Sequence, residues 1–306
     1  MVKYKFRAVG WQDNLNLIVY FSIILSGIGI TWLALNEVPA GIRYITIFLV
    51  SVAFLFVSFF FINEDQKEEA MKIIKNPFEV DYDVASGLYI LGWLIPIILY
   101  FILKAVGSAF VISQLMVPLS AGSVLQEIQT QSFAIAETQA DPFWQWFITV
   151  FTAGSIEEFA FGFVLMLVGT LIGMMIWRLA VGKDTVKARW FYITVALIFT
   201  GLIFGGAHKL NASYVGIMFL IAIGFRLVMN YSIYVLGVFL SFTLGYHQSN
   251  NAVWFYTNYG SAATFQALTS IGGIAILIYF TLIIFYAIKN LPTIIEKIPK
   301  VLTQKG

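Results

Sequence analysis

The chain contains no cysteine and only two histidines in 306 residues, and only 11% of its residues are charged. The lack of cysteine excludes disulfides, thiol nucleophiles and thiolate metal ligands. A soluble domain carries about 25% charged residues because it needs a solvated surface. The low charge therefore indicates that most of the surface faces lipid. The net charge of +2 is too small to indicate binding to nucleic acid.

Apolar residues make up 60% of the chain and gather in long runs. About 20 such residues are needed to cross a hydrocarbon core as a helix. We therefore predict an all-α, polytopic transmembrane helix bundle of about eight spanning helices, with residues 1–306 forming a single integral membrane domain. The runs lie at about 17–35, 42–62, 87–112, 144–177, 190–208, 212–226, 227–245 and 267–288.

Two places in this pattern are ambiguous. The fourth run, 144–177, is too long for one perpendicular span, and one interpretation divides it into two helices at a solvated turn at Gly154-Ser155. The sixth and seventh runs are separated only by Arg226. Seven spans with a re-entrant segment are therefore the alternative to eight.

Basic residues predict the orientation in the membrane. Fourteen of the 18 Lys and Arg lie in segments 1–16, 63–86, 178–189 and 289–306, which fall on one side if eight helices alternate. Because cytoplasmic loops are enriched in basic residues, we predict that both termini are cytoplasmic. Segment 63–86 is predicted to form an amphipathic cytoplasmic helix, and segment 113–142 an outer loop or cap.

The most informative residues are polar ones that interrupt or end the apolar runs, because such residues are costly in lipid unless paired or solvated. Two carboxylates lie inside the fourth run, one histidine ends the fifth, and a His/Asn pair follows the seventh. Under the predicted topology all of them reach the outer half of the membrane. We predict that they line one polar cavity; they are Glu157, Glu158, His208, His247 and Asn251.

These residue types suit hydrolysis. A carboxylate and an imidazole can hold a water and take its proton, while a second imidazole and an amide can stabilise an oxyanion. A zinc site built from Glu157, His208 and His247 is the alternative, but the chain lacks a His-Glu-x-x-His helix. We predict a peptidase without metal or other cofactor.

Three motifs in order carry a resemblance: Glu157-Glu158, Phe204-x-x-x-His208 and His247-x-x-x-Asn251. They resemble the CAAX-protease and bacteriocin-processing family of intramembrane glutamic peptidases, over about residues 150–255 within a core of about 144–266. The resemblance implies that Glu157 and His208 activate water. It further implies that His247 and Asn251 form the oxyanion hole and that Glu158 supports the site. The expected substrate is a membrane-associated or membrane-spanning polypeptide.

One position departs from the family pattern. Its first motif usually reads Glu-Glu-x-x-x-Arg, and the arginine position is Gly162 in this chain. Two adjacent carboxylates without a cation should not both stay ionised in a poorly solvated site. Either Arg226 or Lys209 replaces the cation, or the protein is a weakened or inactive scaffold that binds partner membrane proteins. A transporter that uses the carboxylates as a proton relay is a third hypothesis.

Overall fold

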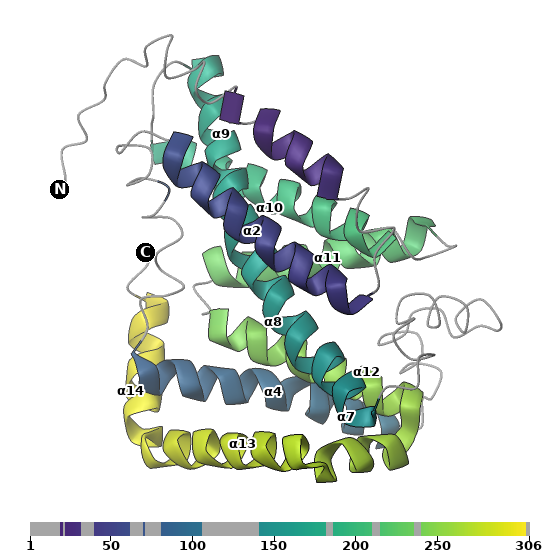
Figure 1. The fold of residues 1–306 in the computed structure, drawn as a ribbon. Coiled ribbons are helices and arrows are strands. Elements are labelled where there is room, and N and C mark those ends of the chain that lie inside the picture. Colours follow the sequence, from purple (N-terminus) through teal and green to yellow (C-terminus); the bar gives the residue numbers. More distant parts are fainter. Residues whose placement is uncertain are drawn as a thin grey trace.

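The computed structural model describes residues 19–20, 22–31, 40–61, 70, 81–105, 141–181, 186–209, 215–235 and 240–303. Over these ranges every regular element is a helix (Figure 1). The predicted all-α class is therefore confirmed. The predicted outer loop up to residue 140 lies outside the described residues, as do residues 63–80 of the predicted amphipathic segment apart from Ala70.

One helical run forms the centre of the molecule (Figure 1). It extends over 40 residues from Pro142 to Val181, and 83% of its most apolar 18-residue stretch is buried inside the protein. It begins with α7 (Pro142–Phe147), where Asp141 accepts a hydrogen bond of 2.8 Å from the backbone N–H of Phe143, as an N-cap residue does. Other helices rather than lipid therefore surround this run.

The central run contains no turn at Gly154. This residue has helical backbone angles, φ −57° and ψ −42°, and the chain continues through it into α9 (Leu165–Val181). The interpretation of two helices divided at Gly154-Ser155 is therefore wrong.

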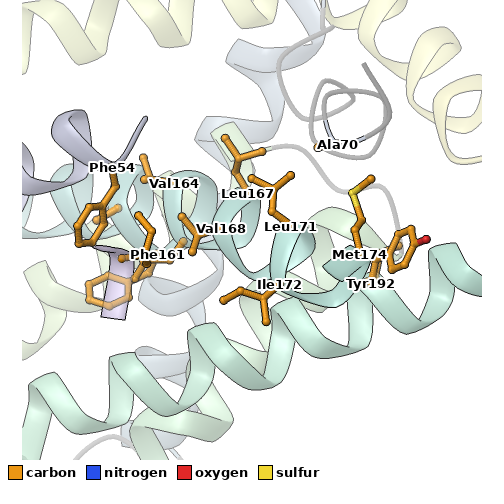
Figure 2. Packing of buried hydrophobic residues seen from close by; sticks show 14 of the residues in the cluster. Phe54, Ala70, Phe161, Val164, Leu167, Val168, Leu171, Ile172, Met174 and Tyr192 are labelled. Atoms are coloured by element: carbon orange, nitrogen blue, oxygen red, sulfur yellow. The ribbon is translucent and has the colours of Figure 1, made fainter. Parts of the chain in front are cut away.

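Helices α2 (Ala40–Phe61), α10 (Val186–Lys209) and α11 (Val215–Tyr234) lie with α9 in one part of the bundle (Figure 1). A continuous cluster of buried side chains fills this part, with Phe54 of α2 near Phe161 and Val164 of the central run (Figure 2). The backbones of α9 and α10 approach so closely at Gly169 that an added Cβ would lie 2.6 Å from Cα of Ala196.

Helices α4 (Tyr82–Ala105), α12 (Leu240–Thr269) and α13 (Ile271–Lys289) form the other part (Figure 1). Helix α12 bends at Gly260, whose φ of 82° favours glycine. Helices α4 and α12 are in direct backbone contact, since a Cβ at Gly245 would lie 2.2 Å from the carbonyl oxygen of Tyr89. By contrast, only 11% of the most apolar 18-residue stretch of α13 is buried.

The last helix, α14 (Leu291–Thr303), crosses the ends of α4 and α13 (Figure 1). Ile294 packs on α4 at Gly87, and Lys297 Nζ lies 2.5 Å from Asp81 Oδ2. The hydrogen bond to Asp81 raises the pKa of Lys297 above its ordinary value.

Four helices in the described part of the chain are long and apolar enough to cross a membrane, and two shorter apolar helices, Ser22–Thr31 and Tyr44–Ser58, accompany them. The expected count of about eight is therefore not reproduced. The four are Tyr82–Ile102, Pro142–Val181, Ala188–Gly206 and Ile271–Lys289.

The largest error concerns the predicted sixth and seventh spans. Arg226 does not separate two helices but lies inside α11, which continues to Tyr234. The next described helix, α12, begins at Leu240 and continues to Thr269. His247 and Asn251 therefore lie within a helix that is rich in polar residues, rather than after a helix. Hydropathy did not reveal this because Arg226 is paired with a carboxylate inside the protein.

Candidate functional site

Glu157 and Glu158 lie where the central run departs from α-helical geometry. The short α8 (Gly154–Glu157) is flanked by two π-helical segments, η1 (Ile148–Ala153) and η2 (Glu158–Val164). Such π turns are rare and occur frequently at functional sites. Both glutamates are buried, with 9% of Glu157 and 1% of Glu158 exposed.

Arg226 of α11 pairs with Glu158. Its Nη1 lies 2.8 Å from Glu158 Oε1 and its Nη2 lies 3.0 Å from Glu158 Oε2, a bidentate geometry that only arginine provides. The Arg226 side chain is completely buried. Nη2 also donates to Asn230 Oδ1 at 2.8 Å, whereas Nε has no hydrogen-bond partner among the described residues.

Helix α11 presents a row of three polar side chains to the π-helical segment η2. Arg226, Asn230 and Tyr234 are spaced four residues apart and therefore share one face. Asn230 Nδ2 donates to the carbonyl oxygen of Phe161 at 3.1 Å, and the Tyr234 hydroxyl donates to that of Gly162 at 2.6 Å. Arg226 thus donates to the Glu158 carboxylate, while Asn230 and Tyr234 donate to backbone carbonyls of the π-helical segment.

Gly162 borders the space that the Arg226 guanidinium occupies. A Cβ at position 162 would lie 3.2 Å from Glu158 Oε2 and 3.6 Å from Arg226 Nη2. Of the two cations considered as replacements for the motif arginine, Arg226 is the one seen to pair with Glu158. The side chain of Lys209 lies outside what the structure describes.

His247 of α12 bridges the two glutamates. Its Nδ1 lies 2.8 Å from Glu158 Oε1, and its Nε2 lies 3.4 Å from Glu157 Oε2. His247 is 4% exposed, and the Phe225 ring packs edge-on against its imidazole at 5.3 Å between centroids. Three elements distant in sequence thus place one guanidinium, two carboxyls and one imidazole in contact.

The residue after His247 anchors α12 beside the site. Gln248 accepts a hydrogen bond of 2.5 Å from the Tyr89 hydroxyl and donates one of 3.0 Å to Ser155 Oγ. The indole N–H of Trp93 also donates to its Oε1, at 3.3 Å. These bonds fix the rotation of α12 and hence the direction of the His247 side chain.

Asn251 lies one helical turn from His247. Its Nδ2 donates to the carbonyl oxygen of Thr149 in η1 at 3.1 Å, so it faces the central run without contacting the glutamates in this conformation. The side chain of His208 lies outside the described residues. Its position in α10 is one turn beyond Phe204, whose ring lies 4.9 Å from that of Phe161 and 5.7 Å from Arg226 Cζ.

The structure therefore brings together Glu157, Glu158 and His247 of the predicted set. Asn230 and Tyr234 were not predicted as site residues. Their spacing from Arg226 at intervals of four, in a largely apolar helix, is the signal that could have identified them.

Within the described ranges, no group of three or more His, Cys, Asp or Glu side chains is arranged to hold a metal ion. No family model matches the chain, and no curated protein or solved structure matches it.

Proposed function

We propose that the protein is an intramembrane, metal-independent endopeptidase of the glutamic type, in which Glu157 activates water. The observation that carries this proposal is the 3.4 Å approach of His247 Nε2 to Glu157 Oε2, with His247 Nδ1 anchored on Glu158 at 2.8 Å. A carboxylate beside an imidazole whose other nitrogen is held by a second acid forms an acid–base pair of fixed geometry.

Charge balance places one shared proton in this pair. The Arg226 guanidinium and the Glu158 carboxylate neutralise each other. The remaining two groups are neutral overall whether the proton resides on Glu157 or on His247 Nε2. Because a net charge is costly to bury, the site favours these two states, which differ only in the position of one proton.

The state with ionised Glu157 and protonated His247 suits peptide hydrolysis. As a water attacks the scissile carbonyl carbon, Glu157 takes its proton, and the Nε2–H of His247 donates to the oxyanion that develops. The tetrahedral intermediate then expels the amine, which receives the proton from Glu157. The products are a carboxylic acid and an amine, and no covalent enzyme intermediate forms.

Two further residues complete this proposal through the family resemblance. His208 assists Glu157 in holding the water. Asn251 is the second oxyanion donor, and its amide would turn from the Thr149 carbonyl toward the substrate. The order of the three motifs, together with the contact of Glu157 and His247, supports membership of the CAAX-protease and bacteriocin-processing family.

The apolar helices that surround the site support a membrane location. Both termini are proposed to be cytoplasmic, with the site toward the extracytoplasmic side, as the distribution of basic residues indicates. The substrate class is a membrane-associated or membrane-spanning polypeptide, because the glutamates are in the interior of the bundle.

The test is cleavage of fluorogenic peptides by the protein purified in detergent. Glu157→Gln should abolish turnover, whereas Glu296→Gln, which removes an exposed carboxylate in α14, should not change it. Activity should survive chelators and serine-directed reagents. A wild-type protein that cleaves no peptide between about pH 5 and 9, the range in which a Glu/His pair operates, would overturn the proposal.

A scaffold function is the second candidate. It is favoured by the bonds among Glu158, Arg226 and Asn230, which join α11 to the central run without any substrate. An inactive member of the same fold would act as a subunit of a membrane complex. It would copurify with a defined membrane partner, and Glu157→Gln would leave that association unchanged. A transporter function, the weaker hypothesis, would appear as proton flux in liposomes.

A further inference from the structure

We propose that Arg226 is a positioning residue that acts from α11 through Glu158 to set which nitrogen of His247 carries the proton. The inference rests on the proposed function, because its consequence is to prepare His247 Nε2 for exchange of a proton with Glu157. Gly162 also takes part, because the absence of a side chain at this position leaves room for the Arg226 guanidinium beside Glu158.

The first step concerns Glu158. Arg226 donates to both of its carboxylate oxygens, at 2.8 and 3.0 Å, and Asn230 in turn accepts from Arg226 at 2.8 Å. Since both partners are removed from water, the guanidinium is the group that makes an ionised Glu158 favourable there.

The second step concerns His247. An ionised carboxylate can only accept hydrogen bonds, so the 2.8 Å contact of Glu158 Oε1 with His247 Nδ1 requires a proton on Nδ1. Nε2, which faces Glu157, is then the nitrogen that gains and loses a proton. A neutral Glu158 would instead donate to Nδ1, and the imidazole would carry its single proton on Nε2.

The third step concerns Gly162. An added Cβ there would lie 3.2 Å from Glu158 Oε2 and 3.3 Å from the Leu240 side chain, so a large residue cannot coexist with the present pair. Position 162 is four residues beyond Glu158 and on the same side of the helix. The cation can therefore reach Glu158 from position 162 or from position 226, but not from both.

The decisive experiment is nitrogen NMR of the full-length protein labelled with ¹⁵N-histidine in nanodiscs. The chain contains only two histidines, and the His208→Gln variant assigns the remaining signals to His247. In the wild type we expect His247 to carry a proton on Nδ1. In Arg226→Gln we expect the proton on Nε2 alone. Arg189→Gln removes an exposed arginine and should reproduce the wild-type spectrum.

Kinetics provide the second readout. Arg226→Gln should lower kcat on the order of a hundredfold, because a neutral imidazole stabilises the developing oxyanion less well than an imidazolium held by an ionised Glu158, with little change in KM. Arg226→Lys should recover part of that loss, because it retains the charge but not the bidentate geometry. Gly162→Arg alone should lower activity, because it places a second cation in a filled space.

The relocated pair Gly162→Arg with Arg226→Gly is the rescue variant. It should restore the proton on His247 Nδ1 and at least tenfold of the activity lost in Arg226→Gly. Where Arg226→Gln fails to fold, this pair and Arg226→Lys decide the question. A wild-type His247 spectrum in Arg226→Gln and in Arg226→Gly would overturn the inference and leave the peptidase proposal standing. If Arg226→Gln shows the expected spectral change but the wild-type protein cleaves no peptide, the inference about Arg226 stands and the peptidase proposal fails.

Discussion

The hydroxyl of Tyr234 donates a 2.6 Å hydrogen bond to the carbonyl oxygen of Gly162, which joins the last turn of α11 to the π-helical segment that begins at Glu158. The wide winding of a π turn displaces backbone carbonyls from their usual partners. Tyr234 supplies the donor for one of them and Asn230 for another. Helix α11 therefore stabilises the irregular backbone as well as the glutamate.

The first prediction follows from this bond. Tyr234→Phe should lower the free energy of unfolding by about 0.5–1.5 kcal/mol, because it removes a hydrogen bond to the carbonyl of the buried Gly162. Tyr231→Phe is the matched control on the same helix, where the ring is 46% exposed, and it should change stability by less than about 0.5 kcal/mol. Unfolding in detergent, followed by circular dichroism, measures both variants. Equal midpoints would show that the bond contributes nothing to stability.

The second prediction concerns the contact between α4 and α12. Gly245→Ala places a Cβ 2.2 Å from the carbonyl oxygen of Tyr89, so the two helices must move apart, at a cost of about 1–3 kcal/mol. The movement also displaces His247, two residues further along α12, and should reduce peptidase activity.

Gly224→Ala is the control for that substitution, because nothing lies within 4 Å of a Cβ added there. Alanine is the better helix former, so this variant should gain up to about 1 kcal/mol. Unfolding midpoints and activity of the two variants are compared side by side. A Gly245→Ala protein as stable as Gly224→Ala would contradict the close packing.

The sequence predicted the helical class because apolar runs of membrane length need only composition and periodicity to be recognised. Helices α2, α10 and α13 lie close to where hydropathy placed them. The error at Arg226 has a physical origin. A charged residue in an apolar run is taken as the end of a helix when its partner is not known. The partner of Arg226 is Glu158, which lies 68 residues away in the sequence and so could not be recognised from hydropathy.

The candidate site was predictable in part for the same reason. Glu157, Glu158 and His247 stood out because such residues are costly in an apolar environment, and the structure brings them into contact. The two π-helical segments had no recognisable signal, since their sequences are ordinary apolar stretches. Which nitrogen of His247 faces which glutamate depends on the rotation of α12, which Gln248 fixes through contacts with α4.

The third prediction is the topology. The native chain has no cysteine, so a single introduced cysteine reports without background. Cysteine at Ser120 should react with a membrane-impermeant thiol reagent in intact cells, whereas cysteine at Thr303 should react only after permeabilisation. The reason is the bias of basic residues toward the cytoplasmic side. The opposite labelling pattern would place the glutamates nearer the cytoplasm.

The fourth prediction concerns Asn251, the proposed second oxyanion donor. Its amide is engaged with the Thr149 carbonyl at 3.1 Å, one turn along α12 from His247. Release of that bond costs little because the carbonyl is in a helix, and the freed N–H can then reach a developing oxyanion. Asn251→Ala should therefore lower kcat on the order of a hundredfold, as removal of one such donor does, while KM changes little.

Asn250→Ala is the matched control for Asn251, because it removes the neighbouring amide, which faces a different direction on the same helix. It should retain wild-type kcat. Steady-state kinetics with one peptide substrate compare the two variants, and circular dichroism confirms that both are folded. If Asn251→Ala raises KM and leaves kcat intact, the amide binds the ground state rather than the transition state. If both variants are fully active, the oxyanion is stabilised by His247 Nε2 without an amide partner.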